Sequence, residues 1–132
     1  MYKPLPNERR ETREGKGFPA NFQILIVEDE RLVALDIEDM LRDNGIAEVL
    51  WSPSIARARE IVAANENLGA VVLDLKLSDG SGEILIAEFL ARGIPVVVIT
   101  GYPEFRSAVA PVVHKPFASA QLLEALAQVV PG

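Results

Sequence analysis

From Phe22 onward, short apolar runs alternate with segments in which apolar residues recur every three or four positions. A short run rich in β-branched residues is typical of a strand, and the wider spacing is typical of a helix with one buried face. The runs predict five strands, at residues 22–27, 47–51, 70–75, 94–100 and 112–114. The run at 94–100 is the most hydrophobic and predicts a central strand that is buried on both faces.

Helical periodicity predicts clear helices over residues 30–45, from 53 onward, over 83–92 and over 121–130. In the second of these, Ser52 is predicted as the N-cap and Pro53 as the first helical residue, where a missing N–H does no harm. After Thr100, Gly101 and Pro103 disfavour a helix interior. We therefore predict that the helix between the last two strands is short or mobile.

The alternation of strands and helices predicts an α/β fold with a doubly wound, five-stranded parallel sheet. Right-handed crossovers between parallel strands place helices on both faces of such a sheet. Ligands of these folds bind outside the carboxyl ends of the strands. The residues that end or follow each predicted strand are therefore the first candidates for chemistry.

The chain has 132 residues and a net charge of −6, and its length is typical of one domain. Residues 1–20 hold five basic and three acidic side chains, whereas the remainder holds eight basic and sixteen acidic ones. The first segment is rich in Pro, Gly and charge, which predicts a flexible or disordered tail at 1–20 before a domain at 21–132. An acidic domain disfavours nucleic acid as a partner, because binding to phosphates needs Lys and Arg.

The absence of cysteine excludes disulfides, thiolate zinc sites and a cysteine nucleophile. The one histidine, His114, is expected to be a packing or surface residue, because strand alternation points it away from the side of Lys115. No apolar stretch approaches the roughly 20 residues that span a bilayer. The charged first residues also lack the apolar core of a secretory signal. We therefore expect a cytoplasmic protein with no membrane partner.

Polar residues stand at the ends of four predicted strands. They are Glu28, Asp29, Glu30, Asp74, Thr100 and Lys115. Clustered carboxylates repel one another in a cleft, and a bound divalent cation offsets this repulsion. Oxygen ligands without cysteine favour Mg²⁺ over zinc. A lysine and a threonine on the same edge suit a phosphoryl group, because they offer it a charge and a hydrogen bond.

Four segments, ILIVEDE, VVLDLKLSDGSG, VVVITGY and VHKPF, resemble in order and spacing the response-regulator receiver domains of two-component signalling. The resemblance covers residues 21–132. It implies a flavodoxin-like (βα)5 fold with strand order 2-1-3-4-5, in which Asp74 accepts a phosphoryl group from a histidine kinase. Taken alone, Asp74 is more typical of a turn cap, and Glu30 is typical of an acidic residue at a helix N-terminus. The four matched segments together favour the receiver interpretation.

The resemblance also implies a role for each matching residue. Asp29 and Asp74 would ligate Mg²⁺ directly, Glu28 would help through water, and the backbone carbonyl of Lys76 would complete the protein ligands. Thr100 and Lys115 would bind the phosphoryl oxygens. The Lys115–Pro116 peptide bond would be cis, a form that is common only before proline.

Two positions depart from the commonest receiver pattern. Val112 stands three positions before Lys115, where an aromatic switch residue is expected, so an aromatic rotamer flip is unavailable there. Thr100 is followed by Gly101 and Tyr102, which resembles a subgroup of single-domain regulators named for a Phe-Ala-Thr-Gly-Gly/Tyr motif, although Val-Ile replaces Phe-Ala here. Gly101 and Tyr102 are therefore candidates for a switch or a partner contact.

The resemblance implies a stand-alone response regulator, because 132 residues leave no room for a DNA-binding output domain. It would switch protein-protein contacts, with a histidine kinase and a downstream protein as partners, as a monomer or weak dimer. It would not be an enzyme beyond self-phosphorylation and dephosphorylation. The alternative is an adaptor that works without phosphorylation, or a phosphate sink. A Mg²⁺-dependent phosphohydrolase is a third hypothesis, but the sequence shows no cap segment for a substrate pocket.

Overall fold

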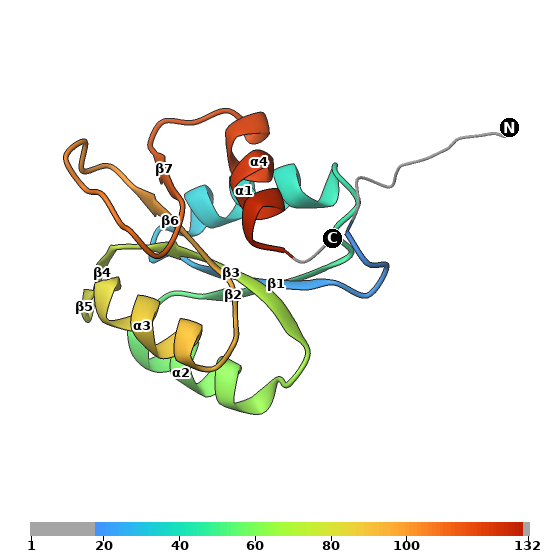
Figure 1. Cartoon of the computed structure of the whole chain (residues 1–132), viewed down its shortest axis with the longest axis horizontal. Helices are drawn as coiled ribbons and strands as arrows, with labels where there is room; N and C mark the ends of the chain where they lie inside the picture. Colours follow the sequence, from blue (N-terminus) through green and yellow to red (C-terminus); the bar gives the residue numbers. More distant parts are fainter. Residues whose placement is uncertain (1–17, 131–132) are drawn as a thin grey trace, which may run out of the picture.

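The computed structural model describes residues 18–130, which are built around one parallel sheet of order β2-β1-β3-β6-β7 (Figure 1). Its strands are β1 (Gln23–Val27), β2 (Glu48–Ser52), β3 (Leu68–Asp74), β6 (Val96–Thr100) and β7 (Val112–His114). Every pairing in this sheet is parallel. Since β6 and β7 are the fourth and fifth strands of this sheet along the chain, the predicted five-stranded parallel sheet and its order 2-1-3-4-5 are confirmed.

The described residues form the helices α1 (Arg31–Arg42), α2 (Ile55–Ala64), α3 (Glu83–Ala91) and α4 (Ser119–Val129). Helices α1 and α4 cover one face of the sheet, and α2 and α3 cover the other (Figure 1). Alternate residues of one strand enter the two cores: Leu25 packs on the α2–α3 side, and Ile24 and Ile26 pack on the α1–α4 side. All residues of β6 are buried, as the hydrophobic run predicted.

A short hairpin follows β3 and is separate from the main sheet. Its strands β4 (Lys76–Leu77) and β5 (Gly80–Ser81) pair antiparallel. The sequence Ser78–Gly82 predicted only a loop here, on composition. Because β3 ends at Asp74, the hairpin stands at the carboxyl edge of the sheet.

The start of α2 differs from the prediction that Ser52 is its N-cap and Pro53 its first residue. Ser52 is the last residue of β2, where it is buried and pairs with Val27. Ser54 is the N-cap, and its side-chain oxygen accepts a hydrogen bond of 3.1 Å from the backbone N–H of Arg57. The prediction was wrong because strand pairing extends through Ser52 and moves the helix start along the chain.

The segment between β6 and β7, residues 101–111, contains no helix. Residues 18–130 therefore contain four helices, one fewer than the five that a (βα)5 fold implies. Gly101 and Pro103 disfavour a helix, as the sequence indicated. The segment instead uses side chains to bond its backbone: Arg106 Nη1 donates to the Pro103 carbonyl at 2.8 Å, and Ser107 Oγ accepts from the Ala110 N–H at 3.2 Å. Whether this segment is mobile stays a prediction.

The predicted flexible tail at 1–20 lies mostly outside the described residues. Phe18 lies within them, and its ring stands 5.5 Å from that of Phe22, against the core on the α1–α4 side. Ordered packing therefore reaches into the segment for which we predicted a tail. Within residues 18–130, no helix has the length and apolar character needed to cross a bilayer.

Candidate functional site

The carboxyl ends of β1, β3, β6 and β7 border a cavity of about 410 Å³. It is lined by Asp29, Glu30, Asp74, Lys76, Gly101, Tyr102 and Lys115. The lining comes from four separate strand ends, which the sheet order brings to one edge. This is the edge at which an open parallel sheet binds its ligands.

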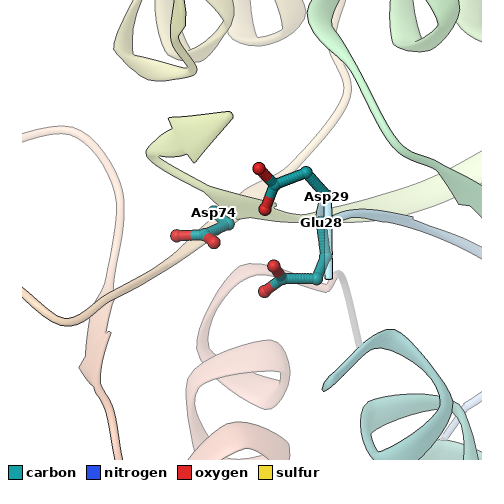
Figure 2. Close-up of side chains that lie close together, drawn as sticks. All are labelled: Glu28, Asp29 and Asp74. Atoms are coloured by element: carbon teal, nitrogen blue, oxygen red, sulfur yellow. The ribbon is translucent and has the colours of Figure 1, made fainter. Parts of the chain in front are cut away.

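Three of the predicted metal ligands meet at this edge. Glu28 and Asp29 directly follow β1, Asp74 ends β3, and these two strands are neighbours in the sheet. Their carboxylates turn toward one another (Figure 2), with one oxygen of each within 4.8 Å of the others. Glu28 and Asp74 are buried. Three close carboxylates, two of them buried, form a strongly negative site that favours a cation.

Lys115 supplies a positive charge to this cluster. Its Nζ donates a hydrogen bond to Glu28 Oε1 at 3.0 Å and another to Asp74 Oδ2 at 3.1 Å. The residue follows β7, and its backbone N–H donates to the Thr100 carbonyl at 2.8 Å, which continues the pairing of β6 with β7. The peptide bond between Lys115 and Pro116 is cis. The sheet therefore places the ammonium group between two carboxylates that are distant in the sequence.

The charges at this edge change the ionisation of two groups. Burial raises the pKa of Glu28 to about 7, although the Glu30 N–H and Lys115 both donate to its carboxylate and oppose the rise. Burial lowers the pKa of Lys115, but its hydrogen bonds with Glu28 and Asp74 outweigh this, and the net change is a raised pKa. Lys115 is therefore charged at neutral pH, whereas Glu28 is poised to gain or lose a proton there.

Thr100 ends β6 and is buried, with its side-chain oxygen engaged by the next segment. Its Oγ1 accepts a hydrogen bond of 3.1 Å from the backbone N–H of Tyr102. The Tyr102 side chain is half exposed and lines the cavity, whereas Phe105 is partly buried against the core. Of the two aromatic residues, only Tyr102 is thus placed for contact with a ligand or a partner.

The remaining predicted residues take different places around the cavity. The Lys76 N–H lies 3.4 Å from Asp74 Oδ1, so this backbone stands beside the central carboxylate. Glu30 is the N-cap residue of α1, although its side chain makes no capping hydrogen bond. His114 lies away from the cavity, with its Nε2 3.3 Å from the Phe105 carbonyl. The expectation of a packing role for His114 agrees with this placement.

Sequence reasoning missed two residues that support the site. The indole N–H of Trp51 donates to the backbone carbonyl of Glu28 at 2.8 Å, and the Arg31 guanidinium stacks 4.4 Å above the Trp51 ring. Asp79 binds the start of α2 from the hairpin. The one sequence feature that could have pointed to Trp51 is its place as the single tryptophan at the end of a predicted strand. No comparable feature marked Asp79, because composition predicted only a loop for its segment.

A family model described as the response regulator receiver domain matches residues 24–127. The phyllosphere-induced regulator PhyR of Methylorubrum extorquens is 30% identical over 113 residues, which cover 80% of this chain and 42% of that protein. The chain thus spans less than half the length of this curated relative.

Solved structures give the same assignment. SdrG of Sphingomonas melonis Fr1 is similar with a TM-score of 0.70 and 33% identity over 83% of this chain and 97% of that one. The PhyR of Bartonella quintana, described as an anti-anti-sigma factor, is similar with a TM-score of 0.67 and 29% identity, covering 80% of this chain and 46% of that one. Together with the family match over most of its length, these similarities show that the chain belongs to the response regulator receiver domain family.

Proposed function

We propose that this receiver domain accepts a phosphoryl group on Asp74 from a histidine kinase and thereby changes its contacts with a downstream protein. The observation that carries the proposal is the Lys115 ammonium, which lies between the buried carboxylates of Glu28 and Asp74 at the cavity. A fixed cation beside a carboxylate that lines a cavity suits phosphoryl transfer, because the charge on the transferring group must be neutralised.

The carboxylate cluster also fits Mg²⁺. Its members offer only oxygen, and their ligand atoms lie within 4.8 Å of one another, which allows them to share one small ion. Asp29, Asp74 and the Lys76 carbonyl would hold the ion, with Glu28 acting through water. When bound, Mg²⁺ supplies a second cation, besides the Lys115 ammonium, to neutralise the phosphoryl oxygens.

Asp74 is the nucleophile in this proposal. One of its oxygens attacks the phosphorus of a phosphohistidine in line, so that a P–O bond forms while the P–N bond breaks and the imidazole leaves with the electron pair. Lys115 already donates to Asp74 at 3.1 Å and needs little movement to pair with the incoming group. Hydrolysis later returns the free carboxylate. We propose no enzyme activity beyond this self-directed chemistry.

Thr100 supplies the response to phosphorylation. Its hydroxyl oxygen now accepts from the Tyr102 N–H. A phosphoryl oxygen on Asp74 would accept a hydrogen bond from the Thr100 hydroxyl, and a turn of this side chain toward the phosphoryl group would draw Oγ1 away from the Tyr102 N–H and release the start of residues 101–111. A segment with no helix can then change its conformation, which alters the surface offered to a partner.

The relatives indicate the kind of partner. One PhyR relative is described as an anti-anti-sigma factor. We therefore propose that the downstream partner belongs to sigma-factor control, and that the output is a protein contact rather than DNA binding. Because histidine kinases draw their phosphate from ATP, we place this phosphotransfer in the cytoplasm.

The proposal is tested by phosphorylation with acetyl phosphate, which needs no knowledge of the kinase. Wild-type protein with Mg²⁺ should gain one phosphoryl group by intact mass, removable by hydroxylamine as expected of an aspartyl phosphate, and Asp74→Asn should gain none while keeping its circular dichroism spectrum. The wild type should also lose labelling when EDTA removes the metal. Labelling of Asp74→Asn would contradict the assignment. An unlabelled wild type that still binds its partner would instead support the phosphorylation-independent adaptor.

A further inference from the structure

The first turn of α2 is capped by a residue far along the chain. The carboxylate of Asp79 accepts a hydrogen bond from the Ile55 N–H at 2.9 Å and another from the Ala56 N–H at 3.1 Å. Ser54 takes the next donor, the Arg57 N–H. The first N–H groups of a helix have no partner within it, so Asp79 supplies two of those partners. These two bonds lower the pKa of the Asp79 carboxyl, which is therefore charged at neutral pH.

Asp79 lies at the turn of the β4–β5 hairpin, which is too small to be stable alone. Each strand has two residues, and isolated hairpins are marginally stable in water even when longer. The hairpin is held at its base by the Gly82 N–H, which donates to the Leu75 carbonyl at 2.7 Å. At its tip, the charged bonds of Asp79 join it to α2. Hydrogen bonds to an ionised carboxylate are stronger than those between neutral groups.

The same hairpin forms one wall of the functional site. Lys76, its first residue, lines the cavity, and the Lys76 N–H stands beside Asp74 Oδ1. The other side of the hairpin faces α2, where Asp79, Gly80 and Ser81 line a separate hollow. A shift of the tip away from α2 would therefore move the backbone that borders the phosphoacceptor carboxylate.

We propose that Asp79 is a positioning residue for the metal and phosphoryl site: by tying the hairpin to the start of α2, it holds the Lys76 backbone in place beside Asp74. This inference rests on the proposed function, since it assigns Lys76 to the Mg²⁺ site. It goes beyond that function because Asp79 neither lines the cavity nor touches the carboxylate cluster.

The test compares Mg²⁺ binding in the full chain by amide NMR titration and calorimetry for wild type, Asp79→Ala, Asp79→Asn and Ser54→Ala. Asp79→Ala should weaken Mg²⁺ binding by about tenfold, the lower end for loss of a supporting group around a metal. Asp79→Asn keeps one acceptor oxygen, so its Mg²⁺ affinity should fall between those of wild type and Asp79→Ala. Ser54→Ala removes a cap from the same helix turn but leaves the hairpin bonds, so its Mg²⁺ affinity should match wild type.

A second readout separates positioning from general stability. In acetyl phosphate labelling, Asp79→Ala should need about ten times more Mg²⁺ for half-maximal rate but should reach the wild-type rate at saturation, because Asp74 and Lys115 are unchanged. In wild type, Mg²⁺ should also shift the Ile55 and Ala56 amide signals, and Asp79→Ala should abolish the coupling between the site and α2.

Three results overturn the inference. Equal Mg²⁺ affinity in wild type and Asp79→Ala, with wild type still phosphorylated, removes the positioning role and leaves the proposed function intact. An equal loss in Ser54→Ala shows that α2 stability, and not the hairpin, sets the affinity. A wild type that neither binds Mg²⁺ nor accepts a phosphoryl group overturns both the proposed function and this inference.

Discussion

The two segments that border the site are held in different ways, although each follows a buried strand of the same sheet. Asp79 bonds the hairpin after β3 to α2, and the Gly82 N–H bonds it to the carbonyl of Leu75, the residue that follows β3. In residues 101–111, after β6, the side-chain bonds of Arg106 and Ser107 stay within the segment. One wall of the cavity, the supported wall, is therefore tied to a helix by charged hydrogen bonds. The other is held to the rest of the protein by the packing of Phe105 and Ala110 against the core and by the contact of the Phe105 carbonyl with His114 Nε2.

This difference divides the work of the site. The supported wall carries Asp74 and Lys76, and the proposed metal binding and attack require these residues to keep a fixed geometry. The other wall begins at Thr100 and Tyr102. The Tyr102 N–H donates to Thr100 Oγ1, and the proposed turn of Thr100 toward a phosphoryl group would break this hydrogen bond. A signalling domain needs both properties, because chemistry requires a rigid site and output requires a segment with low local stability.

The largest expected effect comes from removing the charge between the walls. Lys115→Met should slow self-phosphorylation by about 100-fold or more, because a preorganised cation is lost where charge develops. Mg²⁺ affinity should rise, because a competing cation leaves Glu28 and Asp74. The control is Lys76→Met, whose side chain is exposed and whose assigned role is in its backbone. Equal losses of labelling in the two variants would contradict the special role of Lys115.

Amide hydrogen exchange compares the two walls directly. We expect the amides of residues 102–110 to exchange roughly 100-fold faster than those of Ile55 and Ala56, since segments without regular structure open at low free energy. Mass spectrometry or NMR exchange at constant pH measures both regions in one sample. Protection of residues 102–110 equal to that of the start of α2 would remove the contrast.

A substitution in the supported wall should cost folding stability. A Cβ on Gly82 would lie 2.4 Å from the carbonyl oxygen of Asp74, which is a backbone atom and cannot shift easily. Gly82→Ala should therefore lower the free energy of unfolding by about 2 kcal/mol, as overpacking commonly does. Gly101→Ala in the other wall meets no atom within 4 Å and should cost little. Urea unfolding of the two variants provides the comparison.

The smallest effect is a dependence of metal binding on pH. Burial raises the pKa of Glu28 from 4.5 to about 7, so in the folded protein the Glu28 carboxyl keeps its proton until the pH approaches 7. Mg²⁺ must displace the proton below pH 7, and affinity should increase roughly tenfold between about pH 6 and 8. Glu28→Gln has no such proton and should give a flatter profile. A wild-type profile as flat as that of Glu28→Gln would show that Glu28 does not assist the metal.

The sheet and the candidate site were predictable because both follow from strand ends. Apolar runs locate the strands, and a parallel sheet brings Glu28, Asp29 and Asp74 to one edge whatever their separation in sequence. Local sequence signals gave the wrong role for residues whose role is set by a tertiary contact. Ser52 looked like a cap but pairs within β2, and Asp79 looked like a loop residue but caps a helix 24 positions away. Neither contact leaves a periodic pattern, because each depends on which segments the fold brings together.

The central claim is that a phosphoryl group on Asp74 acts on residues 100–111 and not on the hairpin. An amide NMR titration with Mg²⁺ and then beryllofluoride, which mimics the phosphoryl group on a carboxylate, tests it beside Asp74→Asn. We predict that Mg²⁺ shifts the signals of Asp29, Asp74 and Lys76, and that beryllofluoride then shifts those of Thr100 to Pro111 in wild type alone. Mg²⁺ binding followed by no response in residues 100–111 would contradict the account.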